Sequence, residues 1–391
     1  MDFRLSAADE DFQTSLLQFL GEELPPGWEG RGRWAEDDDW DFTKSLRKKL
    51  ADKGWLTMHW PEEYGGQGVS PVRSALFNEE MSYNRAPGRD IFGVRMLAPT
   101  LMIYGTEEQK KEFLLPVAKG EVQWCQGYSE PGSGSDLASL QTRAVADGDD
   151  YVINGSKIWT TMAHRADWIM LLARTDTDAP KHRGISFILV DMKTPGVTVQ
   201  PVHNMTGGHD FNQVFLDNVR VPKRNLVGEE NRGWYVGVTL LDFERSGIDY
   251  SAISRRILSD VTEHVKNTRA NGKTLASDTR VRNLLIDRYI ESETARLLAY
   301  GVAWMQGEGM VPNKEASMSK VFGSETLQRV TGSCLEILGL YGQLRDGEAW
   351  APIRGRVPED WMHSFSHTVA AGTSEVQRNI IASRGLGLPR G

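Results

Sequence analysis

The fold of this chain is decided by two runs of sequence, Trp168-Ile-Met-Leu-Leu-Ala173 and Ile185-Ser-Phe-Ile-Leu-Val-Asp191. Both are short, apolar and rich in β-branched or aromatic residues, and two further runs of this kind begin at Asp150 and Val197. Gly, Pro, Asn and Asp residues lie between the runs, as they do in the turns that join strands. The pattern predicts an antiparallel β-barrel or β-sandwich over residues 121–226, not a series of βαβ units.

Helical periodicity flanks this β region on both sides. Apolar residues recur at three- and four-residue spacing in segments before it and after it. The segments are 43–53, 71–81, 107–119, 233–266, 278–306, 314–338 and 374–383. The predicted fold class is therefore α+β with three domains. These are an N-terminal α-helical domain (residues 1–120), the middle β domain (121–226) and a C-terminal four-helix bundle (227–391).

Composition limits the kind of partner that the chain can have. A chain of 391 residues, 40% of them hydrophobic, is long enough to bury two or three cores. Its formal net charge of -8 and the absence of a basic block argue against a nucleic-acid partner. The two cysteines, Cys125 and Cys334, lack the spacing of a disulfide framework or of a zinc site. We expect small-molecule and protein partners, no bound metal and a reducing compartment.

The amino-terminal sequence carries no recognisable targeting signal. Met-Asp-Phe-Arg-Leu-Ser-Ala-Ala-Asp-Glu-Asp lacks the apolar core of a signal peptide and is acidic, unlike an Arg-rich transit peptide. No apolar run approaches the ~18 residues needed to cross a bilayer. These features predict a cytoplasmic protein with no membrane partner.

One acidic residue, Glu244, falls on the apolar face of a predicted helix. Within the segment 233–266, its neighbours three or four residues away include Leu240, Gly247 and Ile248. Such neighbours remove water from a carboxylate, which disfavours its charged form and raises its pKa. A carboxylate of this kind can act as a base near neutral pH. The alternative is a glutamate that reaches water or pairs with a distant arginine.

Two segments of the β region carry polar groups suited to a planar ligand. The first, residues 124–136, contains Gly132-Ser-Gly134, but it lacks the third glycine and the βαβ context of a dinucleotide fingerprint. Its backbone N–H groups and hydroxyls can hold a cofactor edge or an anion, although an ordinary turn explains it equally well. The second, Asn154-Gly-Ser-Lys-Ile-Trp-Thr-Thr161, offers an aromatic wall and hydroxyls, although a strand Trp is more often part of the core.

Four motifs together resemble the acyl-CoA dehydrogenase family, in that family's order and over essentially the whole chain. They are Glu-Pro-Gly-Ser-Gly-Ser-Asp (130–136), Asn-Gly-Ser-Lys-Ile-Trp-Thr-Thr (154–161), Asp-Asn-Val-Arg-Val-Pro (217–222) and Ala-Gly-Thr-Ser-Glu-Val-Gln-Arg (371–378). The resemblance implies the α, β, α architecture predicted above and FAD as cofactor. It also implies that a base removes the α-proton of an acyl-CoA thioester while a hydride passes to flavin N5, giving the 2,3-enoyl-CoA. Electrons would then pass to an electron-transfer flavoprotein.

The resemblance also assigns binding roles to particular residues. FAD would lie between the β domain and the C-terminal helices, with the thioester stacked on the flavin and hydrogen-bond donors aimed at the developing enolate. The implied FAD contacts are Gln126, Tyr128, Ser129, Gly134, Ser135, Trp159, Thr160, Thr161, Thr373 and Glu375. The implied substrate contacts are Ser135, Asp242 and Arg245.

The chain departs from the family pattern at the base position near the C-terminus. Many members have Glu-Gly-Thr-Ser there, whereas this chain has Ala371 followed by Gly-Thr-Ser. Other branches, including the isovaleryl and long-chain types, place the glutamate on the first long C-terminal helix, directly before an arginine. Glu244-Arg245 fits that pattern, so the resemblance implies Glu244 as the catalytic base. Arg245 could instead pair with Asp249 one turn on.

A second departure affects the half of the FAD site that the family takes from a neighbouring subunit. The family's Arg-x-x-Phe-Gly corresponds here to Thr268-Arg-Ala-Asn271-Gly, and its Gln-x-x-Gly-Gly to Glu336-Ile-Leu-Gly-Leu340. The missing arginine would have bound the FAD pyrophosphate. Either another cation, such as Arg269, replaces it in a homodimer or homotetramer, or a paralogous subunit supplies the ADP-binding half in a hetero-oligomer.

Two other functions are compatible with the same motifs. One is a non-catalytic or half-site subunit of a hetero-oligomeric dehydrogenase, which the alanine at 371 favours. The other is a flavin oxidase or monooxygenase on the same fold, against which Glu244 and the thioester-side motifs argue. Linear, branched, aromatic and polycyclic acyl groups all fit the sequence, because a fold does not specify a substrate.

Overall fold

The computed structural model describes residues 4–30, 37–244 and 247–389, and for residues 37–39 and 241–244 it describes the backbone alone. The chain forms two compact units. The β unit consists of Arg33–Gly68 and Pro87–Glu244, and the helical unit of Met1–Gly32, Val69–Ala86 and Arg245–Gly391. The boundaries of the predicted three-domain division lie elsewhere, and that division stays a prediction.

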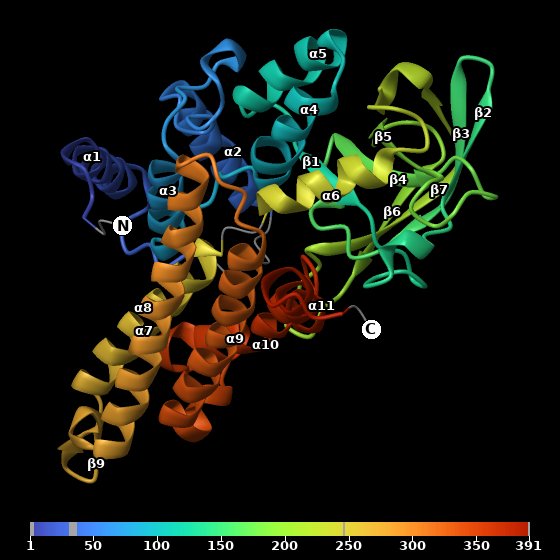
Figure 1. Cartoon of the computed structure of the whole chain (residues 1–391). Coiled ribbons are helices and arrows are strands. Elements are labelled where there is room, and N and C mark those ends of the chain that lie inside the picture. The colour runs from blue at the N-terminus through green and yellow to red at the C-terminus, as the bar shows by residue number, and fades with distance from the viewer. Residues whose placement is uncertain (1–3, 31–36, 245–246, 390–391) are drawn as a thin grey trace. The chain divides into compact units, whose positions relative to one another are not determined.

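One eight-stranded sheet forms the centre of the β unit (Figure 1). The strand order is β6-β7-β3-β2-β4-β5-β8, and β1 pairs with β4. Neighbouring strands are antiparallel, as predicted, except that β4 runs parallel to both β1 and β2. The parallel pairs exist because residues 128–167 make a long crossover between β1 and β4, which parallel pairing requires. The strands are β1 (Trp124–Gly127), β2 (Arg143–Asp147), β3 (Asp150–Lys157), β4 (Trp168–Arg174), β5 (Ile185–Asp191), β6 (Val197–Val202), β7 (Phe211–Pro222) and β8 (Leu226–Val227).

The core of the β unit consists of buried side chains of the sheet, and one helix packs against two of its strands. Residues 169–174 of β4 are all buried, which is expected of a strand covered on both faces. Helix α6 (Gly233–Glu244) packs against β4 and β5 (Figure 1). Gly233 starts this helix so close to β5 that a Cβ atom there would lie 2.2 Å from the Phe187 backbone nitrogen. A glycine is therefore required where α6 begins.

Several helices complete the β unit. The segments 43–53 and 107–119 were predicted to be helical, and both are. Helix α5 begins with a capping box, in which Thr106 and Gln109 bond to each other's backbone N–H groups. The helices are α2 (Asp37–Asp52), the π-helical η2 (Ile91–Leu97), α4 (Ala98–Tyr104) and α5 (Glu107–Ala118).

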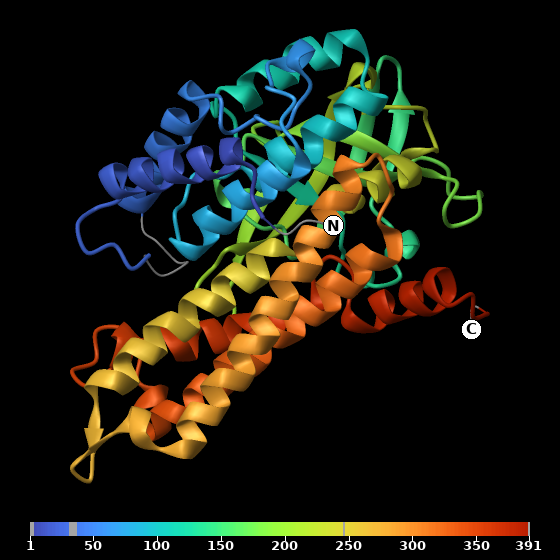
Figure 2. The ribbon, with the colours of Figure 1, turned by 60° about the vertical axis from the view of Figure 1, so that its left-hand side comes forward.

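The helical unit is a bundle of antiparallel helices. Helices α7, α8, α9 and α10 pack along one another and bury Ile257, Val261, Val330 and Cys334 between them (Figures 1 and 2), as the predicted four-helix bundle requires. The short hairpin of β9 (Arg269–Ala270) and β10 (Lys273–Thr274) joins α7 to α8. The helices of the unit are α1 (Ala7–Glu23), α3 (Pro71–Tyr83), α7 (Ile248–Asn267), α8 (Thr279–Gly307), α9 (Asn313–Leu338), α10 (Arg356–Val369), α11 (Ser374–Ile380) and the π-helical η9 (Ile381–Gly385).

A buried carboxylate holds α3 to the bundle. Glu79 of α3 is 1% exposed, and its Oε1 accepts hydrogen bonds from Arg255 of α7 and Arg296 of α8, each at 2.5 Å. The hydroxyl of Tyr300, also on α8, donates to Glu79 Oε2 at 2.6 Å. Because each partner lies on a helix other than α3, this cluster ties together three elements that are distant in sequence.

The predicted helix over 233–266 is two helices instead. Helix α6 ends at Glu244 and α7 begins at Ile248, so these two residues do not share one helix face as the sequence suggested. Gly247, the residue before α7, has a φ of 73°, which lies outside the right-handed helical region and favours glycine. Of the neighbours predicted for Glu244 on its C-terminal side, Gly247 therefore precedes the next helix and Ile248 begins it.

Helices α1, α4 and α10 lie outside the predicted segments, and α4 and α10 each carry a proline near their start. Pro99 and Pro358 fall in the first turn of their helices, where the missing N–H would have no intrahelical partner. None of the helices in the described part of the chain combines the length and the apolar character needed to span a bilayer.

Candidate active site

Two of the predicted flavin contacts, Gln126 and Tyr128, lie at the end of β1. The Nε2 atom of Gln126 is buried and has no hydrogen-bond partner among the described residues. The Tyr128 ring is buried against Phe187, and its hydroxyl donates to the Gly237 carbonyl of α6 at 3.4 Å. A buried donor without a partner costs stability. Gln126 Nε2 is therefore a site where an acceptor on a ligand would be stabilised.

A buried ion pair holds the loop that follows Tyr128. The Nζ atom of Lys157, at the end of β3, donates to Glu130 Oε1 at 2.8 Å and to the Tyr128 carbonyl at 3.1 Å. Lys157 is fully buried, and Glu130 is 8% exposed. Glu130 also accepts from the backbone N–H groups of Gln141 and Thr142, at 2.6 and 2.9 Å. The Glu130 carboxylate thus accepts hydrogen bonds from three donors, one of which is the Lys157 ammonium group.

The pair is ionised at neutral pH. Burial lowers the pKa of Lys157 to about 8, while the charge of Glu130 acts in the opposite direction. Burial also acts to raise the pKa of Glu130, but the charge of Lys157 and the hydrogen bonds to Glu130 outweigh it and keep that pKa below its usual range. Both partners are therefore charged at pH 7, and each compensates for the burial of the other.

The second predicted flavin segment is a turn after β3 with an unusual backbone. Trp159 and Met162 have φ values of 60° and 64°, which residues other than glycine rarely adopt. Between them, Thr160 is fully buried and exchanges backbone hydrogen bonds with Asn212 of β7 at 3.0 and 3.1 Å. The Trp159 ring is 57% exposed, so it is not the core residue that a strand Trp usually is.

The two segments are joined to each other. The Ile158 N–H donates to the Ser129 carbonyl at 2.9 Å, which ties the loop to the turn. The Thr160 hydroxyl is a second buried polar group with no hydrogen-bond partner in the described part of the chain. Thr161 is partly buried, whereas Gly134 and Ser135 lie exposed in the loop. The sequence-predicted contacts of the β unit thus come from two hydrogen-bonded segments.

Glu244 is the last residue of α6. The described side chains of this helix include Val236 and Leu240, both buried, which agrees with the apolar face predicted around the glutamate. For Glu244 and for Asp242 the structure describes the helical backbone and not the side chain. Arg245, the third residue predicted here, lies outside the described residues.

The loop before α11, in the helical unit, has alanine at position 371 and is held by hydrogen bonds. Ala371 and Gly372 have φ values of 55° and 85°. Lys320 Nζ donates to the Gly372 carbonyl at 2.9 Å, and Gln377 Nε2 donates to the Ala371 carbonyl at 2.9 Å. Thr373 caps α11, since its hydroxyl accepts from the Val376 N–H at 3.2 Å. The loop is ordered by hydrogen bonds, yet it offers a methyl group where many relatives carry a base.

The start of α11 presents polar groups beside this loop. The pKa of Glu375 is held below its usual range, first by its own backbone N–H and then by the Thr373 side chain. The Ser374 hydroxyl is buried without a hydrogen-bond partner in residues 4–30, 37–244 and 247–389. Thr373 and Glu375, the two flavin contacts predicted in the helical unit, thus flank a third group that can bind a ligand.

The two departures in the predicted ADP-binding half are both explained by local structure. Thr268 is the C-cap of α7, and Asn271-Gly272 forms the tip of the β9–β10 hairpin with φ values of 51° and 79°, as Asn-Gly turns require. Glu336 of α9 pairs with Arg280 of α8, with 2.7 Å between Oε1 and Nη1. Leu340 is 83% exposed.

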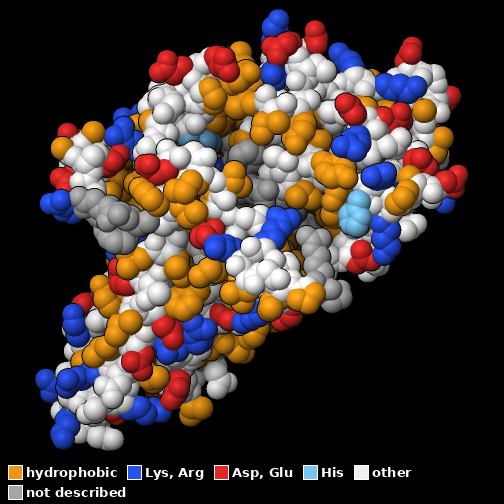
Figure 3. Space-filling model, viewed as in Figure 1, with side chains coloured by type: hydrophobic (Ala, Val, Ile, Leu, Met, Phe, Trp, Pro, Cys, Tyr) orange, Lys and Arg blue, Asp and Glu red, His pale blue; other side chains and the backbone are white. Residues whose placement is uncertain are grey.

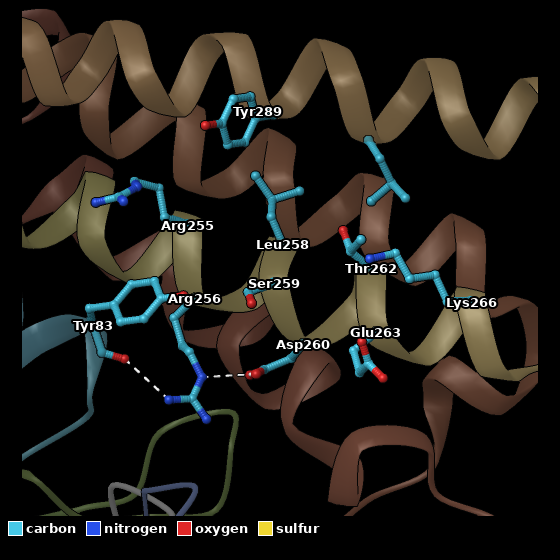
Figure 4. A pocket seen from close by; sticks show the side chains of 11 residues that line it. Tyr83, Arg255, Arg256, Leu258, Ser259, Asp260, Thr262, Glu263, Lys266 and Tyr289 are labelled. Carbon is cyan, nitrogen blue, oxygen red and sulfur yellow. Dashed lines mark hydrogen bonds and ion pairs between the residues drawn. The ribbon is translucent and has the colours of Figure 1, made fainter. Parts of the chain in front are cut away.

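A groove of about 670 Å³ lies between α7 and α8 and contains none of the predicted site residues (Figure 4). Both arginines of the groove are already bound. Arg256 donates to Asp260 at 2.8 Å and to the Tyr83 carbonyl at 3.5 Å, and Arg255 is held by Glu79. Each guanidinium group therefore has a carboxylate partner within the protein.

Sequence reasoning missed the residues that hold the site together. Lys157 and Asn212 bind backbone groups of the predicted flavin segments, and Lys320 binds the loop at 371. A lysine in a polar stretch such as Asn-Gly-Ser-Lys reads as exposed, because lysine is almost never fully buried. The sequence offers Glu130 as an ionic partner for Lys157, but it lies twenty-seven residues earlier.

Comparisons with known proteins identify the family of this chain. Three family models match the chain in order. Acyl-CoA dehydrogenase, N-terminal domain, covers residues 6–121; the middle domain covers 125–219; and the C-terminal domain covers 231–386. Together they account for most of the chain.

Individual relatives agree with the models. Acyl-CoA dehydrogenase FadE26 of Mycobacterium tuberculosis is 40% identical over 350 residues, covering 88% of this chain and 87% of that protein. Acyl-CoA dehydrogenase IpdE1 of the same organism is 34% identical over 395 residues, covering 97% of this chain and 98% of that protein.

Solved structures match across the full length. The ChsE4-ChsE5 complex from Mycobacterium tuberculosis contains a chain with a TM-score of 0.91 and 36% identity, and a structure described as "Tcur3481-Tcur3483 steroid ACAD" gives 0.90 and 35%; both matches cover 100% of each chain. The chain therefore belongs to the acyl-CoA dehydrogenase family of FAD-dependent oxidoreductases, as its motifs predicted.

Proposed function

We propose that this protein converts an acyl-CoA thioester to its 2,3-enoyl-CoA, with Glu244 as the base that removes the α-proton. The observation that carries the proposal is the ordered loop with Ala371 at the position where many relatives have the base. A methyl group takes up no proton, so the base must come from another segment. Glu244 is the carboxylate that the family pattern offers in its place.

The backbone around Glu244 supports this role. As the last residue of α6, it lies at the end of a helix where the helix dipole is negative. A negative potential disfavours an ionised carboxylate and so favours proton uptake by the base. Arg245 follows directly and, with Asp242 and Ser135, is proposed to contact the CoA arm of the substrate.

The residues present fit FAD, which when bound supplies the acceptor for the β-hydride. Gln126 Nε2, Thr160 Oγ1 and Ser374 Oγ are buried polar atoms without partners in the described structure. An amide and two hydroxyls suit the carbonyl and ring nitrogen groups of a flavin. The exposed Trp159 ring offers a flat apolar surface for a heterocycle. We propose that the ten FAD contacts predicted from the sequence bind this cofactor, and that an electron-transfer flavoprotein reoxidises it.

An anaerobic titration tests the proposed reaction. The FAD-loaded protein is mixed with a panel of acyl-CoAs, and loss of the visible flavin absorbance is followed. Bleaching by at least one acyl-CoA is expected for the natural protein and is abolished in Glu244→Gln. Glu308→Gln, which changes an exposed glutamate at the end of α8, is the matched control and should bleach normally. Undiminished bleaching in folded Glu244→Gln would overturn the assignment of the base.

One matched structure supports a proposal for the class of acyl group. The solved structure described as a steroid ACAD supports a polycyclic acyl group among the classes left open by the sequence. The same titration tests this choice, since bleaching by steroid-derived acyl-CoAs should occur at lower concentrations than bleaching by linear ones of similar length. A preference for linear acyl-CoAs would contradict it.

We further propose a hetero-oligomer in which a paralogous subunit holds the ADP half of FAD. Glu336, which replaces the family's glutamine, is a carboxylate already paired with Arg280, and it would repel a pyrophosphate. Two of the matched structures are named for pairs of chains, ChsE4-ChsE5 and Tcur3481-Tcur3483.

The surface of the bundle supports an oligomer of this kind. Apolar side chains lie exposed among charged ones over the helical unit (Figure 3). On α8 they recur at helical spacing and form one stripe: Ile286, Tyr289, Ile290 and Leu297, each 45–57% exposed. Exposed apolar side chains that gather in one stripe are typical of a protein interface.

The flavin content of the purified protein tests the hetero-oligomer. Expressed alone, the chain should hold well under one FAD per subunit, and co-expression with the paralogue should restore it. Full occupancy in the lone protein would instead support a homodimer or homotetramer in which Arg269 or another cation binds the pyrophosphate.

A further inference from the structure

The flavin segments of the β unit are held together by a residue to which the family pattern assigns no cofactor contact. Three hydrogen bonds join residues 128–130 to the end of β3. Two come from Lys157 Nζ, to the Tyr128 carbonyl and to Glu130, and the third joins Ile158 N–H to the Ser129 carbonyl. The first segment carries Tyr128 and Ser129, and the second leads directly into Trp159, Thr160 and Thr161.

A lysine at this position is costly. Its side chain is fully buried, and removing an ammonium group from water costs several kcal/mol even when an ion pair compensates part of it. An apolar side chain of similar length would fill the same space without this cost. Stability alone therefore does not explain the lysine, and what it adds over an apolar residue is directional bonding to a specific backbone carbonyl.

The Tyr128 carbonyl, which accepts from Lys157, lies where β1 leads into the loop. Tyr128 is fixed on its other side, because its ring packs on Phe187 and its hydroxyl bonds to α6. Lys157 thus fixes the backbone at the point where the chain turns from β1 into the loop. Glu130 has a different task, since it also accepts from the Gln141 and Thr142 N–H groups and closes the loop on itself.

We propose that Lys157 is a positioning residue for the flavin: by bonding the Tyr128 carbonyl, it sets the spacing between the two segments that carry the proposed FAD contacts of the β unit. The proposal rests on the proposed function, because those contacts belong to it. Glu130 keeps the ammonium group charged and buried, whereas the bond from Lys157 to Tyr128 determines the shape of the site.

A set of variants separates positioning from stability. Glu130→Gln keeps the bond from Lys157 to Tyr128 and one carbonyl acceptor for the Thr142 N–H, but it removes the ion pair and the oxygen that accepts from the Gln141 N–H. Lys157→Met combined with Glu130→Gln leaves no unpaired buried charge but removes the bond to Tyr128. Lys181→Met is the matched control, because Lys181 forms an exposed ion pair with Asp136 of the same loop, at 2.7 Å.

The variants are compared by FAD affinity, by the shape of the visible flavin spectrum and by thermal stability, in the oligomer that retains FAD. In the double variant the dissociation constant of FAD should rise about tenfold, as expected for loss of one positioning hydrogen bond. Its stability should equal or exceed that of Glu130→Gln, in which Lys157 is left as an unpaired buried charge. Glu130→Gln and Lys181→Met should bind FAD within about twofold of the natural protein.

Hydrogen exchange gives a second readout that does not depend on FAD. The amides of residues 128–130 should exchange faster in the cofactor-free double variant than in cofactor-free Glu130→Gln. If the methionine variant does not fold, Lys157→Gln with Glu130→Gln replaces it, because the shorter amide does not reach the Tyr128 carbonyl. Equal FAD affinity and equal exchange in the folded double variant would overturn the proposal alone. Failure of the natural protein to bind FAD in any assembly would overturn the proposed function together with it.

Discussion

Two buried carboxylates, Glu79 in the helical unit and Glu130 in the β unit, are paired with cations in different ways. In the helical unit, Glu79 accepts from two arginines and a tyrosine that come from α7 and α8. In the β unit, Glu130 pairs with the single, fully buried Lys157, and all of its partners come from residues 141–157.

The difference indicates that the same chemistry serves two purposes. Glu79 joins helices that are more than 170 residues apart in sequence, as its bond to Arg255 shows, so its pairing contributes mainly to folding. Glu130 and Lys157 join two neighbouring segments that carry the proposed flavin contacts, so their pairing contributes mainly to the shape of the site. Variants of the two clusters should therefore change different measured quantities.

Replacement of Glu79 should cause the largest loss of stability. Glu79→Gln leaves Arg255 and Arg296 without the charge that they share, and breaking a buried ion pair costs about 3–5 kcal/mol. We expect the free energy of unfolding in chemical denaturation to fall by that amount, while the folded protein binds FAD normally. Glu325→Gln, which breaks an exposed pair with Arg378, is the control and should cost less than about 1 kcal/mol. Loss of FAD affinity in folded Glu79→Gln would remove the distinction between the clusters.

Alkaline pH should change the free energy of unfolding through the Lys157–Glu130 pair but not through the Glu79 cluster, and this effect should be smaller than that of Glu79→Gln. The pKa of Lys157 is about 8 in the folded protein, where Glu130 and Arg174 are the charged groups that act on it, and about 10.4 when unfolded. Between these values the unfolded state binds more protons, so the contribution of Lys157 to the free energy of unfolding rises with pH, by up to about 3 kcal/mol. The pKa of Arg296 is raised by its bond to Glu79 against the effect of burial, so the Glu79 cluster keeps its protons.

The measurement is the pH dependence of unfolding for the natural protein and for Lys157→Met with Glu130→Gln. The natural protein should gain stability relative to the variant between about pH 8 and about pH 10. A constant difference over this range would mean that Lys157 keeps its proton and that burial does not lower its pKa.

Removal of the Tyr300 hydroxyl should have the smallest effect. Burial, followed by the charge of Glu79, raises the pKa of Tyr300, so the hydroxyl stays protonated and donates. Tyr300→Phe removes one hydrogen bond to a charged acceptor and leaves both arginines in place, which should cost about 1.5 kcal/mol of unfolding free energy. A cost as large as that of Glu79→Gln would show that the cluster fails as a unit when any one partner is lost.

Local patterns were sufficient to predict most of the fold, and they indicated two segments of the proposed site. The alternation of apolar runs and turns predicted β3, β4, β5 and β6, and helical spacing predicted most of the bundle. The proposed flavin segments were chosen from Gly, Ser and Trp motifs, and their role stays a prediction. These features depend on residues close together in the sequence, which periodicity and turn chemistry describe well.

Features that depend on distant contacts could not be predicted. The parallel pairing of β1 with β4 follows from strand order, which no local pattern encodes. The burial of Lys157 depends on Glu130, twenty-seven residues earlier, and on the Tyr128 carbonyl. The break between α6 and α7 was missed because Gly247 lies within an otherwise continuous helical pattern, where one glycine is often tolerated.

The claim that Glu244 removes the α-proton is tested most directly by hydrogen exchange at the substrate. An acyl-CoA with sulfur in place of its β-carbon can lose an α-proton but has no β-hydrogen to transfer, so exchange in deuterium oxide reports the base alone. With FAD bound, the natural protein and Glu308→Gln should exchange the α-hydrogens. Glu244→Gln should do so at least about a hundredfold more slowly. Exchange at the natural rate in folded, FAD-loaded Glu244→Gln would contradict the account.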